Sequence, residues 1–199
     1  MNASLATSLL VLLNPFVIAL IYISYRPNVR VREALRDGIN VCLASTSIMS
    51  IIILSGTRLL DWVGVSLPAI RVAGGLILML SVYGLMNEAE VSSRGRDFNL
   101  ASPFVTPICV GGASIALLFQ YIAPVPALTL AVFISLFTAV FFCFLVIGLS
   151  MPMMVLFSRF IPEGVRSGVK SISLFFVFAI GVDLLGGGLA DLYLARFGS

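Results

Sequence analysis

Six stretches of mainly apolar residues occupy most of the chain, and short polar connections separate them. Each stretch is close to the roughly 20 residues that an α-helix needs to cross the hydrocarbon core of a bilayer. Numbered as spans 1 to 6, they lie at residues 3–25, 38–57, 66–87, 102–123, 126–150 and 169–190. Because lipid offers the backbone no hydrogen-bond partners, a crossing segment of this kind folds as a helix. The sequence therefore predicts an all-α, polytopic membrane protein with six transmembrane helices.

The composition leaves little material for a water-soluble domain. Charged residues make up 11% of the 199 residues, whereas soluble domains carry about 25%, and the mean hydropathy is +1.13. No linker interrupts the chain, so we expect a single integral membrane domain over residues 1–199. Span 1 is not preceded by basic residues, as a cleaved signal peptide would be, and we expect it to remain as a helix.

The chain contains no histidine. This excludes histidine-ligated haem and zinc sites, and also the Ser-His and Cys-His dyads of nucleophilic enzymes. Cys42, Cys109 and Cys143 lie within apolar runs and form no C-x-x-C pair, so we interpret them as small core residues. The basic residues are scattered over short connections and form no patch for nucleic acid. We therefore expect a protein that is not an enzyme and that has no cofactor, metal or nucleic-acid partner.

Most of the basic residues fall in the connections that follow spans 1, 3 and 5. They are Arg26, Arg30, Arg32, Arg36, Arg94, Arg96, Arg159, Arg166 and Lys170. Lys and Arg are enriched in the cytoplasmic connections of membrane proteins. The pattern predicts that these three connections are cytoplasmic and that both termini are extracytoplasmic. The lipid bilayer is the one certain partner, and no feature of the sequence indicates an oligomeric state.

Helix-breaking residues divide the chain into two comparable halves, residues 3–87 and 102–190. Asn14-Pro15 interrupts span 1, and Gly111-Gly112 interrupts span 4, at corresponding places in the two halves. Because each half has an odd number of spans, the second half enters the membrane with the opposite orientation. The pattern predicts two inverted three-helix repeats with spans 1 and 4 discontinuous. Interruptions of this kind are typical of transporter binding sites at the midplane of the bilayer.

The two interruptions predict helix starts that can attract an anion. Asn14 suits an N-cap and Pro15 the first helical position, so a half-helix is expected from Phe16 toward Tyr25. Gly111-Gly112 permits unwinding, and a second half-helix is expected to restart around Ala113-Ser114. Each helix N-terminus carries about half a positive charge, which favours a carboxylate. The alternative interpretation is that these residues only kink the helices or allow close packing.

Glycine and proline also mark the last two spans. The apolar run of span 5 continues toward Phe160, past Gly148 and Pro152, and we expect these two residues to end or kink the helix. Gly186-Gly187-Gly188 in span 6 is interpreted as a site of close helix packing, with a helix end as the alternative.

Two charged residues lie inside the predicted spans. Arg71 lies near the start of span 3, where it can extend to the headgroups or pair with a carboxylate. Asp183 lies near the middle of span 6 between apolar neighbours, and a charge at that depth is costly unless it is paired, neutralised or hydrated. We expect Asp183 to face the bundle interior, where its protonation or a contact with Arg71 would couple transport to protons.

Several segments resemble the MarC family of bacterial integral membrane proteins. These are L-L-N-P-F-V-I-A-L-I-Y at 12–22, V-S-L-P-A-I-R-V-A-G-G-L-I-L at 65–78, P-F-V-T-P-I-C-V-G-G-A-S-I at 103–115 and V-F-A-I-G-V-D-L-L at 177–185. The resemblance implies a six-helix inner-membrane protein with two inverted repeats, and some relatives transport small neutral amino acids. The chain has Asn14 where the family typically has Asp, and Gly111-Gly112-Ala113 lacks the proline of the second motif.

The sequence thus favours an inner-membrane secondary transporter or exporter of a small zwitterionic solute, such as a neutral amino acid. The alternative is a non-transporting integral membrane subunit or scaffold. The expected substrate-binding residues are Asn14, Pro15, Gly111, Gly112, Ala113, Ser114, Arg71 and Asp183.

Overall fold

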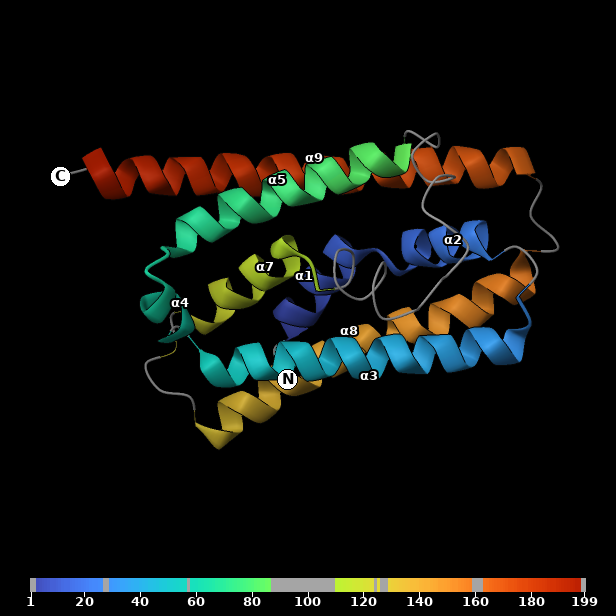
Figure 1. Ribbon diagram of the computed structural model, residues 1–199, viewed down its shortest axis with the longest axis horizontal. Coiled ribbons are helices and arrows are strands. Elements are labelled where there is room, and N and C mark those ends of the chain that lie inside the picture. Colours follow the sequence, from blue (N-terminus) through green and yellow to red (C-terminus); the bar gives the residue numbers. More distant parts are fainter. Residues whose placement is uncertain are drawn as a thin grey trace.

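The computed structural model describes residues 3–26, 29–56, 58–86, 110–123, 125, 129–158 and 163–197. Every element within these ranges is a helix, as predicted (Figure 1). The helices are α1 (Ala3–Leu13), α2 (Pro15–Tyr25), α3 (Val31–Ser55), α4 (Arg58–Val63), α5 (Leu67–Met86), α7 (Gly112–Ile122), α8 (Leu130–Phe157) and α9 (Glu163–Phe197).

Five segments are long and apolar enough to cross a bilayer, and they coincide with five of the six predicted spans. The first of them, Ala3–Ile23, is built from α1 and most of α2. The predicted fourth span is represented by α7, a helix of 11 residues, and residues 101–109 lie outside the described part of the chain. We expected Gly148 and Pro152 to end or kink the fifth span. The helix does not end there, because α8 continues to Phe157.

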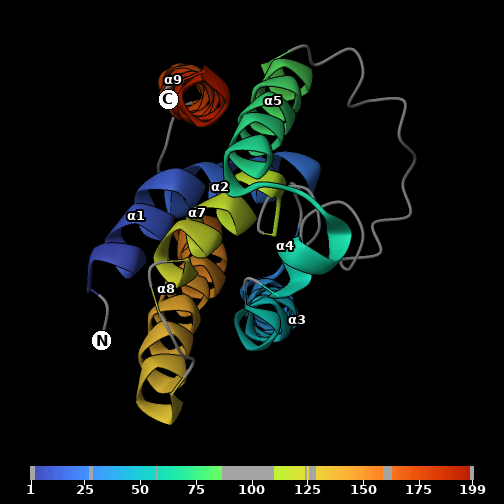
Figure 2. The same ribbon diagram turned by 90° about the vertical axis from the view of Figure 1, so that its left-hand side faces the viewer.

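The helices form three layers, which Figure 2 shows end-on. The pair α5 and α9 forms one layer, the pair α3 and α8 forms another, and α1, α2 and α7 lie between them. The middle layer holds the most deeply buried segment, because every residue from Val17 to Ile23 on α2 is at most 4% exposed. A helix that is apolar and buried on all sides belongs at the centre of a bundle.

Both outer pairs join one helix from each half of the chain. Helix α3 (span 2) packs on α8 (span 5), and α5 (span 3) packs on α9 (span 6). In the middle layer, α1 from span 1 contacts α7 from span 4. Each span therefore packs against its counterpart in the other half.

Glycines allow the two helices of an outer pair to come into backbone contact. A Cβ built on Gly38 of α3 would lie 2.1 Å from the carbonyl oxygen of Gly148 on α8, and one on Gly148 would lie 2.6 Å from the carbonyl oxygen of Gly38. Pro152 has no N–H to donate to the carbonyl of Gly148 four residues earlier, and that carbonyl faces Gly38. Helix α8 nevertheless continues through Pro152. Small residues that let helix backbones approach are a common basis of packing within membranes.

We predict that Gly38→Ala destabilises the protein strongly. The added methyl group would overlap a backbone carbonyl that no side-chain rotation can move, and overpacking of this kind costs about 3 kcal/mol or more. Gly84→Ala on α5 is the matched control, because a Cβ there meets nothing within 4 Å, and alanine favours a helix by about 0.5–1 kcal/mol over glycine. The thermal midpoints of the purified variants in detergent test this; equal midpoints would contradict the packing described.

Candidate functional site

The first helix is interrupted where the sequence predicts it, between α1 and α2. Asn14 adopts a left-handed conformation with φ 42° and ψ 86°, and its side-chain oxygen accepts a hydrogen bond from the backbone N–H of Val17 at 3.4 Å. Pro15 is the first residue of α2 and contributes no N–H. Asparagine tolerates left-handed backbone better than most residues. The break therefore follows from the local preferences of two adjacent residues.

The second half-helix, α7, begins at Gly112 with Gly111 as its N-cap, and the cap makes no side-chain hydrogen bond. The first intrahelical bond runs from the N–H of Ile115 to the carbonyl of Gly111 at 3.1 Å. The N–H groups of Gly112, Ala113 and Ser114 thus precede the hydrogen-bond ladder of α7. The predicted restart around Ala113-Ser114 is confirmed to within one residue.

One pocket is lined by the start of α7 and by residues on either side of the Asn14-Pro15 interruption, but Asn14 and Pro15 themselves are not among its lining residues. Its volume of about 40 Å³ suits a few water molecules, since one water needs roughly 10–15 Å³. Most of the lining is apolar, and Ser81 and Ser114 contribute hydroxyl groups. The walls near the helix starts are formed by Leu12, Leu13, Val17, Ile18, Gly111, Gly112, Ala113 and Ser114. Of the predicted site residues, the pocket is lined by Gly111, Gly112, Ala113 and Ser114.

The two helix starts differ in how much of their positive end remains available. At α2 the side chain of Asn14 occupies the N–H of Val17, and Pro15 has no N–H. At α7 the N-cap residue is Gly111, which has no side chain to accept from the helix. A negatively charged group in the pocket would therefore interact mainly with the start of α7.

Helix α5 is held against the start of α7 by another pair of glycines. A Cβ on Gly74 would lie 2.6 Å from the carbonyl oxygen of Gly112 and 3.0 Å from the backbone nitrogen of Ala113. Only glycine at position 74 permits this approach, which brings Ser81 and Leu78 of the same helix to the pocket.

Arg71 and Asp183 are not brought together. Arg71 Nη1 donates to Oδ2 of Asp191 at 2.5 Å. The guanidinium lies beside Gly187, where a Cβ would be 3.2 Å from Nη2. Asp183 is exposed, so the expectation that it faces the bundle interior is wrong. Neither residue is among those lining the pocket.

Of the three glycines of span 6, Gly187 and Gly188 pack against α5, as interpreted from the sequence, whereas a Cβ on Gly186 would meet nothing within 4 Å. Helix α9 continues through them to Phe197. A Cβ on Gly188 would lie 2.8 Å from the backbone nitrogen of Val72 on α5. This contact fixes the position of α9 along α5, and it places Asp191 rather than Asp183 beside Arg71.

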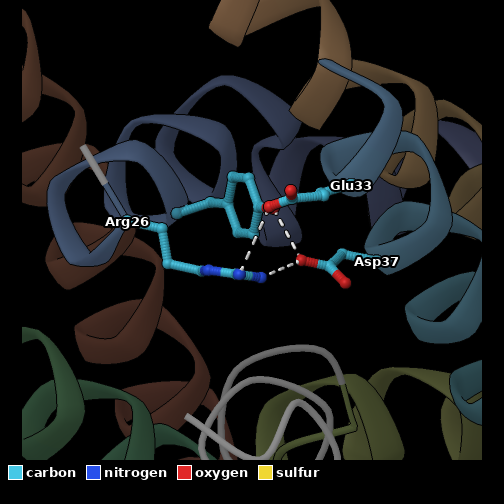
Figure 3. A network of polar contacts seen from close by, with 4 residues as sticks. Arg26, Glu33 and Asp37 are labelled. Carbon is cyan, nitrogen blue, oxygen red and sulfur yellow. Dashed lines mark hydrogen bonds and ion pairs between the residues drawn. The ribbon is translucent and has the colours of Figure 1, made fainter. Parts of the chain in front are cut away.

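A polar cluster that the sequence analysis missed lies at the other end of α2 (Figure 3). Asp37 of α3, only 6% exposed, accepts hydrogen bonds from the hydroxyl of Tyr22 at 2.7 Å and from Arg26 Nη1 at 2.6 Å. Arg26 Nη2 also lies 3.6 Å from Oε2 of Glu33. The available signal was two acidic residues, Glu33 and Asp37, within the first turns of a long apolar helix and close to a cluster of arginines. The cluster ties the end of α2 to the start of α3.

Comparison with known proteins identifies a family of integral membrane proteins. Residues 2–193 match the family described as MarC family integral membrane protein. The chain belongs to the MarC family. It is similar to a UPF0056 membrane protein of Aquifex aeolicus (strain VF5), with 26% identity over 201 residues, which cover 93% of this chain and 90% of that protein. No solved structure matches the chain.

For this MarC protein we predict that Asn14→Ala costs about 2 kcal/mol of stability and Asn14→Gly much less. Alanine loses a cap worth about 1 kcal/mol and adds about 1 kcal/mol of left-handed strain. Glycine avoids the strain, and at N-caps it costs only a few tenths of a kcal/mol. Unfolding by sodium dodecyl sulfate in mixed micelles measures the difference. Equal costs for the two variants would show that the left-handed conformation of Asn14 is unimportant.

A second prediction concerns the polar cluster. Tyr22→Phe removes a hydrogen bond to a buried carboxylate and should cost about 1.5–3 kcal/mol. The same change in an Asp37→Ala background should cost much less, because the two side chains act as a pair. Tyr121→Phe is the control, since the hydroxyl of Tyr121 contacts Ser8 at 3.3 Å and its cost should not depend on Asp37. Additive costs for Tyr22 and Asp37 would contradict the pairing.

Proposed function

We propose that this protein is a secondary transporter or exporter of a small zwitterionic solute, such as a neutral amino acid, in the bacterial inner membrane. The observation that carries the proposal is one pocket within the bundle that is lined by the start of α7 and by residues flanking the interruption between α1 and α2, one interruption from each half of the chain. Interrupted helices at corresponding places in two halves are typical of transporter binding sites. The pairing of each span with its counterpart supports the inverted repeat on which the proposal depends.

The chemistry of the pocket favours a ligand with a carboxylate and a small apolar side chain. The uncapped start of α7 offers N–H groups and a partial positive charge to the carboxylate. The hydroxyl groups of Ser81 and Ser114 are polar partners for an ammonium group, and the leucine, valine and isoleucine walls suit a short side chain. A volume of about 40 Å³ corresponds to a closed state, so transport requires the pocket to open.

Ion pairs at the two ends of the bundle suit alternate closure. The Arg26–Asp37 pair lies where α2 ends and α3 begins, and the Arg71–Asp191 pair lies where α5 begins and α9 ends. These positions are at opposite ends of the structure (Figure 1). The concentration of basic residues around Arg26 favours a cytoplasmic position for that end, with both termini outside.

We predict that a neutral amino acid stabilises the purified protein against heat. A ligand at 100 times its dissociation constant adds about 2.7 kcal/mol to the free energy of unfolding. Glycine, alanine, serine and threonine should therefore raise the thermal midpoint, and uptake of the best ligand into proteoliposomes should saturate. Acetate and methylamine, each carrying one of the two charges, should have smaller effects.

Ala113→Leu tests whether the pocket is the binding site. Ala113 is 4% exposed and lines the pocket at the start of α7, so a larger side chain there should abolish both the ligand-dependent shift and uptake. Gln120→Leu on the exposed side of α7 is the control and should retain both. The midpoint without ligand shows that each variant is folded. A wild-type protein with no ligand shift and no uptake would refute the proposal and favour a non-transporting membrane subunit.

A further inference from the structure

Helix α4 joins two segments that are each long and apolar enough to cross a bilayer, Val31–Ser55 and Leu67–Gly84. The connection is short, covering residues 56–66, and α4 rests on the protein through Leu60, which is only 8% exposed. Figure 1 shows α4 at the end of the bundle where α3 ends and α5 begins. Because a spanning segment ends at the edge of the hydrocarbon core, a connection of this length keeps α4 at the membrane surface.

Glycine residues turn the chain at both ends of α4. Gly56 follows α3 with φ 55°, and Gly64 follows α4 with φ 72°, conformations that residues other than glycine rarely adopt. The backbone N–H of Val65 donates to the carbonyl of Leu60 at 3.1 Å and closes the last turn of α4. Helix α4 is therefore a separate hydrogen-bonded element that continues neither α3 nor α5.

The exposed surface of α4 combines an aromatic ring with charged side chains. Trp62 is 86% exposed and Val63 is 57% exposed, and Arg58 and Asp61 are exposed as well. The two charged side chains would be costly in the hydrocarbon core, whereas the indole ring and the valine lose free energy in bulk water. The boundary between lipid headgroups and acyl chains satisfies both kinds of side chain, and tryptophan is enriched there.

A second pair of exposed aromatic residues lies at the same end of the bundle, on α9. Tyr193 is 66% exposed and Phe197 is 68% exposed, and their ring centroids are 5.3 Å apart. Both residues follow Asp191, which pairs with Arg71 near the start of α5. Because α4 directly precedes α5, the last turns of α9 and α4 lie at the same end of the structure (Figure 1).

We propose that α4 and the last turns of α9 bind the headgroup region of the bilayer, with Trp62 and Tyr193 as two anchors at one depth. The partner is lipid, because exposed apolar residues of a membrane-spanning helix lead directly to α4: Ile51 and Leu54 near the end of α3 are each 63% exposed. The indole N–H and the phenol hydroxyl donate to phosphate or ester oxygens of the lipid, while both rings contact the upper acyl chains. Since α4 joins α3 to α5, this contact fixes the depth of both outer helix pairs at this end.

Intrinsic fluorescence tests the depth of α4 directly, because Trp62 is the only tryptophan in the chain. The purified protein is reconstituted into phosphatidylcholine vesicles whose acyl chains carry bromine, a contact quencher, either close to the headgroup or close to the chain end. The bromine close to the headgroup should quench Trp62 most, the bromine at the chain end less, and iodide in the water least. The emission maximum should lie at a shorter wavelength than that of free tryptophan in water.

Moving the tryptophan tests the second anchor and calibrates the depth. In a Trp62→Phe background, Tyr193→Trp should reproduce the quenching profile of Trp62. Leu76→Trp in the same background is the matched control, because Leu76 is 45% exposed near the middle of α5, and the bromine at the chain end should quench it most. Trp62→Phe alone gives the background signal, and the thermal midpoint of each variant in detergent shows that it is folded.

Strong quenching of Trp62 by iodide and none by bromine would place α4 in water and overturn the proposal. Strongest quenching by the bromine at the chain end would place α4 within the hydrocarbon core, and quenching by neither agent would show that protein covers it; each result overturns the proposal as well. Different profiles for Trp62 and for Tyr193→Trp would refute the common depth. The measurement is independent of ligand binding at the pocket, so this proposal and the transport proposal can fail separately.

Discussion

The interruption at Asn14-Pro15 is possible only because the protein itself satisfies the backbone that lipid cannot. Pro15 removes one donor from the helix, and the side chain of Asn14 accepts the N–H of Val17 that the break leaves free. The segment that follows is buried on all sides from Val17 to Ile23. Non-helical backbone at membrane depth is tolerated only where it is enclosed by protein or lines a hydrated cavity. The break therefore requires the central position of α1 and α2 and the outer helices that cover them.

The outer helices meet that requirement through backbone contacts rather than through large interlocking side chains. Within each outer pair, the two helices approach so closely at glycines that an added methyl group would overlap backbone atoms. The glycines are Gly38 and Gly148 in one pair, and Gly75 and Gly181 in the other. Because lipid tails are as apolar as leucine, burying apolar surface gives little preference for helix contact over lipid contact. The attraction that remains is dispersion between closely packed helix backbones, and glycine permits that close approach.

The described helices and the break at Asn14-Pro15 were predictable because they depend on local preference. Apolar length located the spans, and the N-cap preference of asparagine with the N1 preference of proline located the start of α2. The partner of Arg71 was not predictable, because the position of α9 along α5 depends on which glycines meet. The Asp37 cluster was missed for a similar reason: it forms only when α2 places Tyr22 and Arg26 beside α3. Pro152 was predicted to disturb its helix, yet α8 continues through it, and the carbonyl of Gly148 faces Gly38, a residue far away in sequence.

The pairing of helices also constrains the motions that the proposed transport cycle could use. The two outer pairs each combine one helix from each half, so rocking the first half rigidly against the second would separate Gly38 from Gly148 and Gly75 from Gly181 at the same time. A motion that keeps both contacts moves the α3–α8 pair against the α5–α9 pair, which the middle layer separates (Figure 2). Helix α7 would then move with α5 through the contact of Gly74 with Gly112, while α2 would stay with α8 through the hydrogen bond from Ser150 to the carbonyl of Pro15 at 3.0 Å. The two helix starts belong to different moving units, and a solute between them would lie at the boundary where the pocket opens.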